Sequence, residues 1–179
     1  MFRKPAPQRI TVNRAPVLTL WAAVVARRLG FDRDEALTLG RVVAGLNAYA
    51  KGKALGLFKP VPEDVRRSRR QLAHGAQLHV DLLHRAVPVV ATPEGLRALA
   101  KDKPIAPASV QRYLEARFGA ALPAVEQAME GLAQSLPPDE LARRAYALYE
   151  SFRPEVPAGV RGWGAAGVLD LEAIRGAAR

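Results

Sequence analysis

One almost uninterrupted apolar segment, residues 17–26, limits what this chain can fold into more than any other feature. Thr19 is its only polar residue. Asn13 stands at a helix N-cap position, Pro16 falls in the first turn, and Gly30 stands where a helix C-cap favours glycine. A helix that is apolar on most sides must be covered by other elements, so we expect it at the centre of the fold. It has only about half of the ~20 residues that a transmembrane helix needs, which favours a buried helix.

Helix start and stop signals dominate the rest of the chain. Asp32 and Glu35 have the spacing of a capping box, in which each side chain bonds the backbone N–H of the other residue. The helix that follows carries a row of small residues that lets a second helix approach closely: Ala36, Gly40, Ala44 and Ala48. Further helices are expected over residues 62–85, after residues 92–94, and over residues 109–119, 120–135 and 138–152, with a last turn capped by Asp170. Residues 87–92 are the one segment that suggests a short strand or an extended connection.

These signals predict an all-α protein, an irregular bundle of about six to eight helices with at most one short strand-like segment. We expect residues 1–152 to form a single helical domain, with a basic N-terminal half (1–85) and a neutral half (86–152). Residues 153–179 are expected to form a Pro/Gly-rich loop and a short C-terminal helix packed on that domain. Trp163 lies in this loop between two glycines, and we interpret it as an anchor rather than a ligand contact.

The excess of positive over negative charge lies entirely in the first half of the chain. The 179 residues carry a formal net charge of +10. Residues 1–85 hold 16 Lys/Arg and 6 Asp/Glu, whereas residues 86–179 hold 11 of each kind. Such asymmetry suggests a polyanionic partner: nucleic acid, an anionic membrane surface or an acidic protein. The alternative is that the basic charge only keeps the protein soluble.

The strongest candidate site is the polar face of the helix expected over residues 62–85. An arginine side chain can bind two phosphate oxygens, so a row of arginines along a helix can follow a phosphate backbone. We predict phosphate contacts from seven cations: Arg66, Arg67, Arg70, Arg85, Lys51, Lys53 and Lys59. The alternative is a solvated helix face, which is what most charge runs are.

The three histidines do not predict a metal site. His74, His79 and His84 are spaced by five residues, whereas metal ligands on one helix need i+3 or i+4 spacing. His79 falls on the apolar stripe of the expected helix and is interpreted as a core histidine. The chain also lacks the glycine fingerprints of phosphate loops and dinucleotide enzymes, and the motifs of serine hydrolases and zinc proteases. We therefore predict no cofactor, no metal and no catalytic residue.

The residue composition gives two further expectations. The chain has no cysteine, which excludes disulfides, thiolate metal sites and a cysteine nucleophile, and fits a cytoplasmic protein. Asparagine and methionine are scarce and arginine far outnumbers lysine, which suggests a thermophilic source.

Two stretches of the chain carry a family resemblance. The first is Asn13-Arg-Ala-Pro-Val-Leu-Thr-Leu-Trp21, continuing through Gly40 to Lys51-Gly52-Lys53. The second is Arg153-Pro-Glu-Val-Pro together with Arg161-Gly-Trp-Gly. They resemble an uncharacterised family of small bacterial proteins of unknown function. The resemblance implies a soluble bacterial protein and attaches no activity, ligand or catalytic residue to it.

The sequence leaves three functional hypotheses open. The leading one is a non-enzymatic protein that binds nucleic acid through its basic N-terminal half, in a weak, sequence-tolerant and salt-sensitive way. The second is a protein-interaction or scaffold module that binds an acidic partner or self-associates. The third is an enzyme without a recognisable motif, built around His74, Asp81 and His84.

Overall fold

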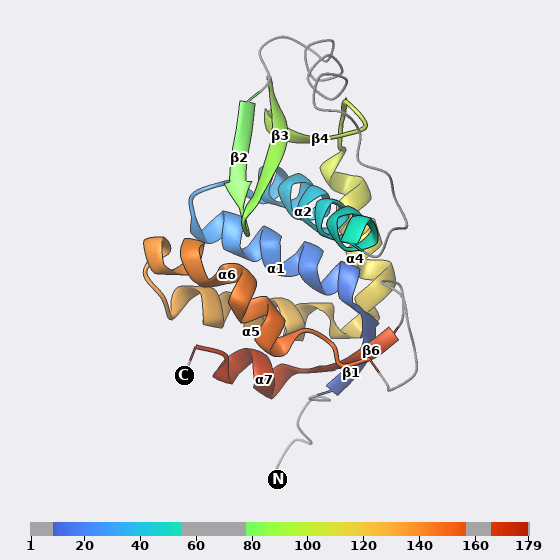
Figure 1. Cartoon of the computed structure of the whole chain (residues 1–179), viewed down its shortest axis with the longest axis vertical. Coiled ribbons are helices and arrows are strands. Elements are labelled where there is room, and N and C mark those ends of the chain that lie inside the picture. Colours follow the sequence, from blue (N-terminus) through green and yellow to red (C-terminus); the bar gives the residue numbers. More distant parts are fainter. Residues whose placement is uncertain (1–8, 55–77, 157–165, 179) are drawn as a thin grey trace.

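The computed structural model describes residues 9–54, 78–156 and 166–178, and the side chains of residues 49–54 lie outside that description. The elements are arranged as Figure 1 shows. The α-helices are α1 (Arg14–Arg28), α2 (Arg33–Ala54), α4 (Pro107–Phe118), α5 (Leu122–Gln134), α6 (Pro138–Phe152) and α7 (Leu171–Gly176), with a short 3-10 turn at Gly119–Ala121. The strands are β1 (Arg9–Asn13), β2 (Leu78–Leu82), β3 (Arg85–Thr92), β4 (Gly95–Ala100), β5 (Lys103–Pro104) and β6 (Ala166–Asp170).

The all-α prediction is wrong, because the described residues form a mixed α/β fold. Strands β2, β3, β4 and β5 form one antiparallel sheet in that order, and β1 and β6 form a second. The segment 87–92 does lie in a strand, but that strand is one member of a sheet rather than an isolated extended piece. Helices occupy several of the predicted ranges, but together with the two sheets they do not form the all-α bundle that was expected.

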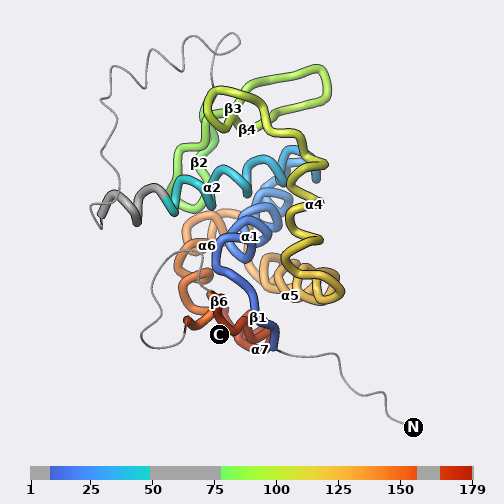
Figure 2. Tube along the Cα trace, turned by 90° about the vertical axis from the view of Figure 1, so that its right-hand side faces the viewer, coloured from blue at the N-terminus to red at the C-terminus, as the bar shows by residue number. Residues whose placement is uncertain are grey.

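Helix α1 lies at the centre of the molecule, as its composition predicts. In Figure 2 it runs between α2 on one side and α5 and α6 on the other. Its side chains from Pro16 to Ala26 are all buried. The Trp21 ring is fully buried, and its Nε1–H donates to the carbonyl O of Ala145 on α6 at 2.8 Å. The hydrogen bond satisfies the one polar atom that burial of this ring would otherwise leave without a partner.

The contact between α1 and α2 confirms the role expected of the small residues. A Cβ atom on Gly40 would lie 2.3 Å from the carbonyl O of Thr19 and 3.0 Å from the backbone N of Ala23. Between the two helices the chain turns at Gly30, whose φ of 114° is the left-handed conformation that favours glycine. The capping box then starts α2: Asp32 N–H donates to Glu35 Oε1 at 3.0 Å, and Glu35 N–H donates to Asp32 Oδ1 at 2.8 Å.

The four-stranded sheet is attached to α2 through two side chains of that helix. The backbone N–H of Leu96 donates to Glu35 Oε2 at 2.9 Å, and the N–H of Ala98 donates to Thr38 Oγ1 at 3.0 Å. These two acceptors stand where a neighbouring strand would supply carbonyl groups. Strand β5 pairs only with Leu99 and Ala100 of β4, so α2 supplies the hydrogen-bond acceptors beside the first part of β4. These bonds fix the sheet on the N-terminal half of α2.

The helix expected over residues 62–85 is wrong in its described part. Residues 78–82 form β2, and β3 begins at Arg85 after a two-residue turn in which Leu83 (φ 49°) and His84 (φ 61°) are both left-handed. Hairpin turns of this kind favour Asn and Gly, so the sequence carried no turn signal here. Leu83 is buried in the core, and this burial offsets the backbone strain. The remainder of that expected helix lies outside the described residues.

A second hairpin replaces the helix expected after residues 92–94. The Thr92 hydroxyl donates to the carbonyl O of Gly95 at 2.7 Å, and this contact closes the turn between β3 and β4. Gly95 has a φ of 120°, which only glycine adopts readily. The Thr-Pro-Glu pattern, interpreted as a helix start, is therefore the tip of a hairpin.

From α4 to α6 the chain follows the sequence prediction closely. Helices α4, α5 and α6 lie where helices were expected, and Asp170 caps α7 by accepting from the N–H of Glu172 at 2.9 Å. The sheet of β1 and β6 was not expected. In it Arg9 pairs with Asp170 and Asn13 with Ala166. Trp163 lies outside the described residues, so its interpretation as an anchor stays a prediction.

Candidate nucleic-acid interface

Of the seven predicted phosphate contacts, the structure describes one side chain. Lys59, Arg66, Arg67 and Arg70 lie outside the described residues, as do the side chains of Lys51 and Lys53 near the end of α2. Arg85 begins β3, is half-buried, and donates from Nη2 to Asn47 Oδ1 on α2 at 3.1 Å. Arg85 therefore ties the sheet to α2, and the face on which it was expected is not a helix at this point.

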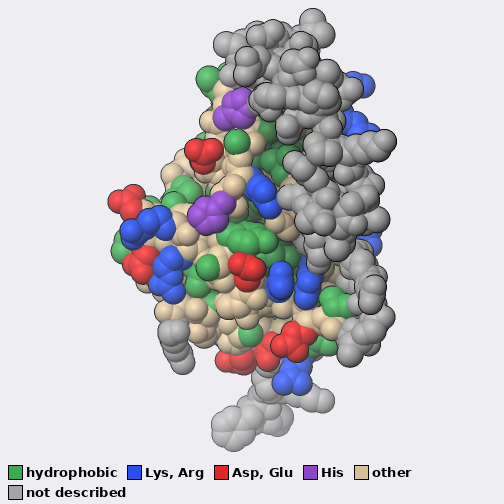
Figure 3. All heavy atoms as spheres, viewed as in Figure 1, with side chains coloured by type: hydrophobic (Ala, Val, Ile, Leu, Met, Phe, Trp, Pro, Cys, Tyr) green, Lys and Arg blue, Asp and Glu red, His purple; other side chains and the backbone are tan. Residues whose placement is uncertain are grey.

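The described histidines lie on the surface rather than in the core. His79 is exposed in β2, so its interpretation as a core histidine is wrong. His84 is exposed in the hairpin turn, with its ring centroid 6.5 Å from that of Tyr146 in an edge-on arrangement. His74 lies outside the description. Histidine, acidic and basic side chains are interspersed over the described part of the face in Figure 3. No group of three or more potential metal ligands is found among the described residues.

Helices α2 and α4 place two arginines against one aromatic ring. The guanidinium carbon of Arg41, on α2, lies 4.5 Å from the centroid of the Tyr113 ring, and that of Arg117, on α4, lies 5.5 Å from it. Tyr113 and Arg117 are four residues apart and so share one face of α4. We call these three residues the arginine–tyrosine cluster. Both distances are within the range of a cation–π interaction.

The cluster is only partly covered by the rest of the protein. Arg41 and Arg117 are exposed, whereas Tyr113 is half-buried. Burial raises the pKa of the Tyr113 phenol above its ordinary value, and the charges of Arg41 and Arg117 oppose that rise. The ring is therefore neutral at physiological pH, and the two guanidiniums carry the charge of the cluster.

Within the described part of the chain, no carboxylate neutralises either arginine of the cluster. Among the described residues, Arg41 and Arg117 make no ion pair, and the same holds for Arg112, exposed on α4. Glu115 is the only acid of α4, and Gln111 Nε2 donates to it at 3.0 Å. Three positive charges of this helix pair therefore remain available to a partner.

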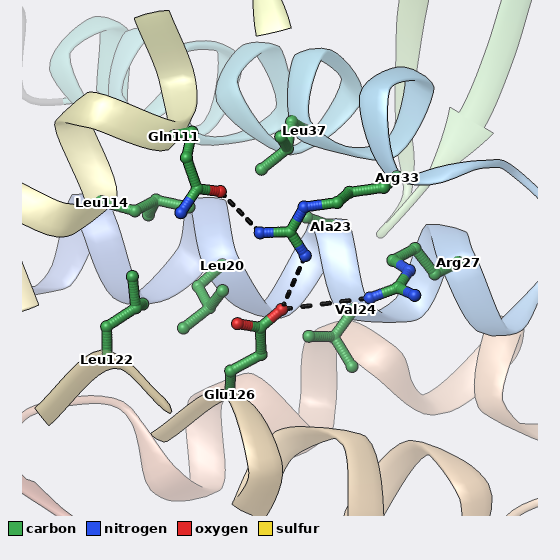
Figure 4. Close-up of a pocket in the computed structure, with 10 residues that line it drawn as sticks. All are labelled: Leu20, Ala23, Val24, Arg27, Arg33, Leu37, Gln111, Leu114, Leu122 and Glu126. Atoms are coloured by element: carbon green, nitrogen blue, oxygen red, sulfur yellow. Dashed lines mark hydrogen bonds and ion pairs between the residues drawn. The ribbon is translucent and has the colours of Figure 1, made fainter. Parts of the chain in front are cut away.

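A different set of arginines is engaged with glutamates between α1, α2, α4 and α5 (Figure 4). Glu126 Oε1 lies 3.3 Å from Arg33 Nη1 and 4.0 Å from Arg27 Nη1, and Arg33 Nη2 donates to Gln111 Oε1 at 2.6 Å. These polar groups lie over a floor of leucines that includes Leu20 and is part of the core. The cavity that they enclose measures about 10 Å³, which is room for about one water molecule. It is too small to be a ligand site.

A wider groove runs beside this network, past the turn between α1 and α2. It measures about 770 Å³, and its lining includes Arg27, Arg28, Phe31 and Glu130. Arg28 Nη2 donates to the carbonyl O of Leu136 at 3.2 Å, and its Nε is buried without a hydrogen-bond partner among the described residues. Arg27 is paired with Glu130 at 3.7 Å. The charges along this groove are mixed, so it has no preference for a polyanion.

Sequence reasoning missed all three residues of the arginine–tyrosine cluster. The i,i+4 spacing of Tyr113 and Arg117 was a readable signal on a helix that was correctly expected. The approach of Arg41 was not readable, because it depends on how α4 packs against α2 across the fold.

No protein-family model, curated protein or solved structure matches this chain. The result is consistent with the resemblance to an uncharacterised family, and it carries no activity, ligand or partner to this protein. Within the described ranges, no helix is long and apolar enough to cross a membrane. The function of this mixed α/β protein must therefore be argued from the protein's own residues.

Proposed function

We propose that this protein binds single-stranded nucleic acid, weakly and without sequence preference, through the arginine–tyrosine cluster on α2 and α4. The observation that supports the proposal most directly is the geometry at Tyr113. Two guanidiniums lie within 5.5 Å of its ring, and neither has a carboxylate partner among the described residues.

The ring contributes by holding the arginines in place. An arginine stacked on an aromatic ring has lost much of its side-chain freedom before a ligand arrives, so binding costs less conformational entropy. Its N–H groups lie in the plane of the guanidinium and remain free to bind phosphate oxygens two at a time. Guanidinium planes and aromatic rings also stack on unpaired bases, which favours a single strand over a duplex. In this proposal Tyr113 is a positioning residue, and Arg41 and Arg117 make the contacts.

The proposal extends the charge argument made from the sequence. Lys51 and Lys53 follow Arg41 along α2, and Lys59, Arg66, Arg67 and Arg70 follow them along the chain. Their contribution to binding remains a prediction. Arg85 is assigned a structural role instead, because its guanidinium bonds Asn47.

Fluorescence anisotropy of the full chain with a labelled single-stranded oligonucleotide, titrated across salt, tests the proposal. The double variant Arg41→Gln/Arg117→Gln is expected to bind at least about tenfold more weakly at low salt. Each lost phosphate contact should also make the slope of log affinity against log salt shallower by about 0.7, the value for single strands. Tyr113→Leu should weaken binding less, because it keeps both charges and loses only their positioning.

The matched control is Arg143→Gln, which removes one exposed charge from α6 that has no ion pair among the described residues. It should change the affinity little. If the double variant binds as the wild type does but unfolds more easily, the cluster serves only to hold α4 on α2. In that case Arg66/Arg67/Arg70→Glu tests the site predicted from the sequence. No binding to any nucleic acid at low salt overturns the proposal and favours an acidic protein partner.

A further inference from the structure

Arg97 is a largely buried arginine that has no ion pair among the described residues. It lies in the middle of β4, and only 9% of its surface is exposed. Its one hydrogen bond runs from Nη1 to the carbonyl O of the adjacent Leu96, at 2.8 Å. Within residues 9–54, 78–156 and 166–178, no carboxylate lies in ion-pair distance and no acceptor faces its Nε or Nη2. Its Nε and Nη2 are not among the buried atoms that lack a partner in the described structure, so these two atoms reach solvent and can bind an anion.

The same arginine lines an open pocket of about 380 Å³ where the sheet meets α2 and α4. Arg33 lines this pocket too, although its Nη atoms are already engaged by Gln111 and Glu126. Among the described residues that line the pocket, Asp34 is the one carboxylate. Among the described lining residues, the charged groups without an ion pair are therefore the buried guanidinium of Arg97 and the exposed carboxylate of Asp34.

The first turn of α4 adds a second anion-attracting group. Pro107 and Ala108 line the pocket, and they are the first two residues of this twelve-residue helix. The N-cap residue Ala106 has no side chain that can cap, and the first turn holds no acid. The N–H of Ala108 consequently lacks an acceptor within the helix, and the positive end of the helix dipole faces the pocket. A helix N-terminus and a buried arginine together are the usual elements of an oxyanion site.

We propose that this pocket binds a small oxyanion of the phosphate class, held by Arg97 and by the N–H of Ala108. The site is separate from the arginine–tyrosine cluster and does not depend on the function proposed for it. Asp34 repels the anion and so weakens the site. Substituting Arg97 should therefore weaken anion binding, and substituting Asp34 should strengthen it.

The test uses the full chain and inorganic phosphate, compared with sodium chloride at equal ionic strength. Phosphate is expected to raise the melting temperature of the wild type, and calorimetric titration should give a saturable isotherm. Arg97→Gln should weaken phosphate binding at least about tenfold, because it removes the buried guanidinium from the described lining of this pocket. Asp34→Asn should tighten it by about threefold, because it removes a like charge near the anion.

Arg112→Gln is the matched control, since it removes an exposed charge from α4 outside this pocket and should leave phosphate binding unchanged. Should Arg97→Gln fold poorly, the Asp34→Asn result and a phosphate-dependent shift of the Ala108 amide NMR signal still decide the matter. Equal melting temperatures of the wild type in phosphate and chloride overturn the proposal, as does an equal response of Arg97→Gln and Arg112→Gln.

Oligonucleotide anisotropy with Arg97→Gln identifies the source of the oxyanion. Unchanged oligonucleotide affinity together with lost phosphate binding assigns the pocket to a free phosphate compound. A loss of both assigns it to a phosphate of the nucleic-acid chain.

Discussion

Arg33 and Arg41 lie about two turns apart on α2, but only Arg33 has a carboxylate partner among the described residues. Arg33 donates to Gln111 and pairs with Glu126 at 3.3 Å, inside a network that joins α1, α2, α4 and α5. Arg41 lies 4.5 Å from the centroid of the Tyr113 ring and has no acid near it among the described residues. One arginine is used to hold helices together, whereas the other keeps its charge for the surface.

The comparison shows that net charge and available charge are different quantities. The chain carries a net charge of +10. Several of the described arginines nonetheless form ion pairs within the protein. Arg27 pairs with Glu126 and Glu130, and Arg9 pairs with Asp170. A polyanion interacts with the cations that remain, and where they lie decides the binding surface.

Gly40 positions both arginines, because it sets how closely α2 lies on α1. Gly40→Ala should lower the free energy of unfolding by about 3 kcal/mol, the largest effect that we expect, since the new Cβ would meet the backbone of Thr19 at 2.3 Å. Denaturant titration measures the loss. Gly45→Ala on the same helix is the control: its Cβ meets nothing within 4 Å, so it should add up to about 1 kcal/mol. Equal effects of the two substitutions would contradict the close packing described here.

Glu126→Gln should leave Arg33 without a carboxylate partner among the described residues, whereas Arg27 keeps its ion pair with Glu130. We expect a loss of about 0.5–1 kcal/mol in unfolding free energy, because these ion pairs are partly exposed. Oligonucleotide affinity should rise about twofold at low salt, since the charge of Arg33 is no longer neutralised. Glu94→Gln changes the net charge equally at an exposed residue without an ion pair in the described structure. If both variants gain affinity equally, engagement by Glu126 does not matter and only net charge does.

The Tyr113 pKa gives the smallest and most local test. Its raised value means that the unfolded chain ionises this phenol at a lower pH than the folded protein does. The stabilising contribution is thus complete below pH 10 and is lost as the pH rises toward the folded pKa. Tyr113→Phe should flatten this alkaline loss of stability without removing it, because burial also raises the pKa of Tyr149. Arg41→Gln should raise the Tyr113 pKa further, as difference absorbance against the Tyr113→Phe variant would show; an unchanged pKa contradicts the contact.

The helices were predictable because their signals are local. The capping box of Asp32 and Glu35, the glycine after α1 and the cap at Asp170 each act within a few residues, and each was confirmed. The close contact at Gly40 was also predictable, since a row of small residues has few other uses. Helix caps and small-residue rows depend on residues that are close together in the sequence, so they can be recognised in a single sequence.

The strands were hidden for two physical reasons. The turns at Leu83-His84 and Lys101-Asp102 adopt left-handed conformations without Asn or Gly in them, so the usual hairpin signal was missing. The backbone N–H groups of Leu96 and Ala98 in β4 donate to side chains of α2 rather than to another strand. A pattern of alternating apolar and polar residues does not indicate such an arrangement. The arginine–tyrosine cluster was not predictable as a whole because Arg41 meets Tyr113 and Arg117 only after α4 has packed on α2.

The pairing of β1 with β6 has a consequence for the time order of folding. α1 and α2 are joined by a short turn and can pack as soon as both have been synthesised. β1 precedes them along the chain, yet its partner strand follows all the other described elements except α7. Closing so long a loop is entropically expensive, which makes this sheet a late event in folding. During synthesis on the ribosome, the backbone edge of β1 waits unpaired while every intervening element is made, and the nascent chain must avoid mispairing until β6 emerges.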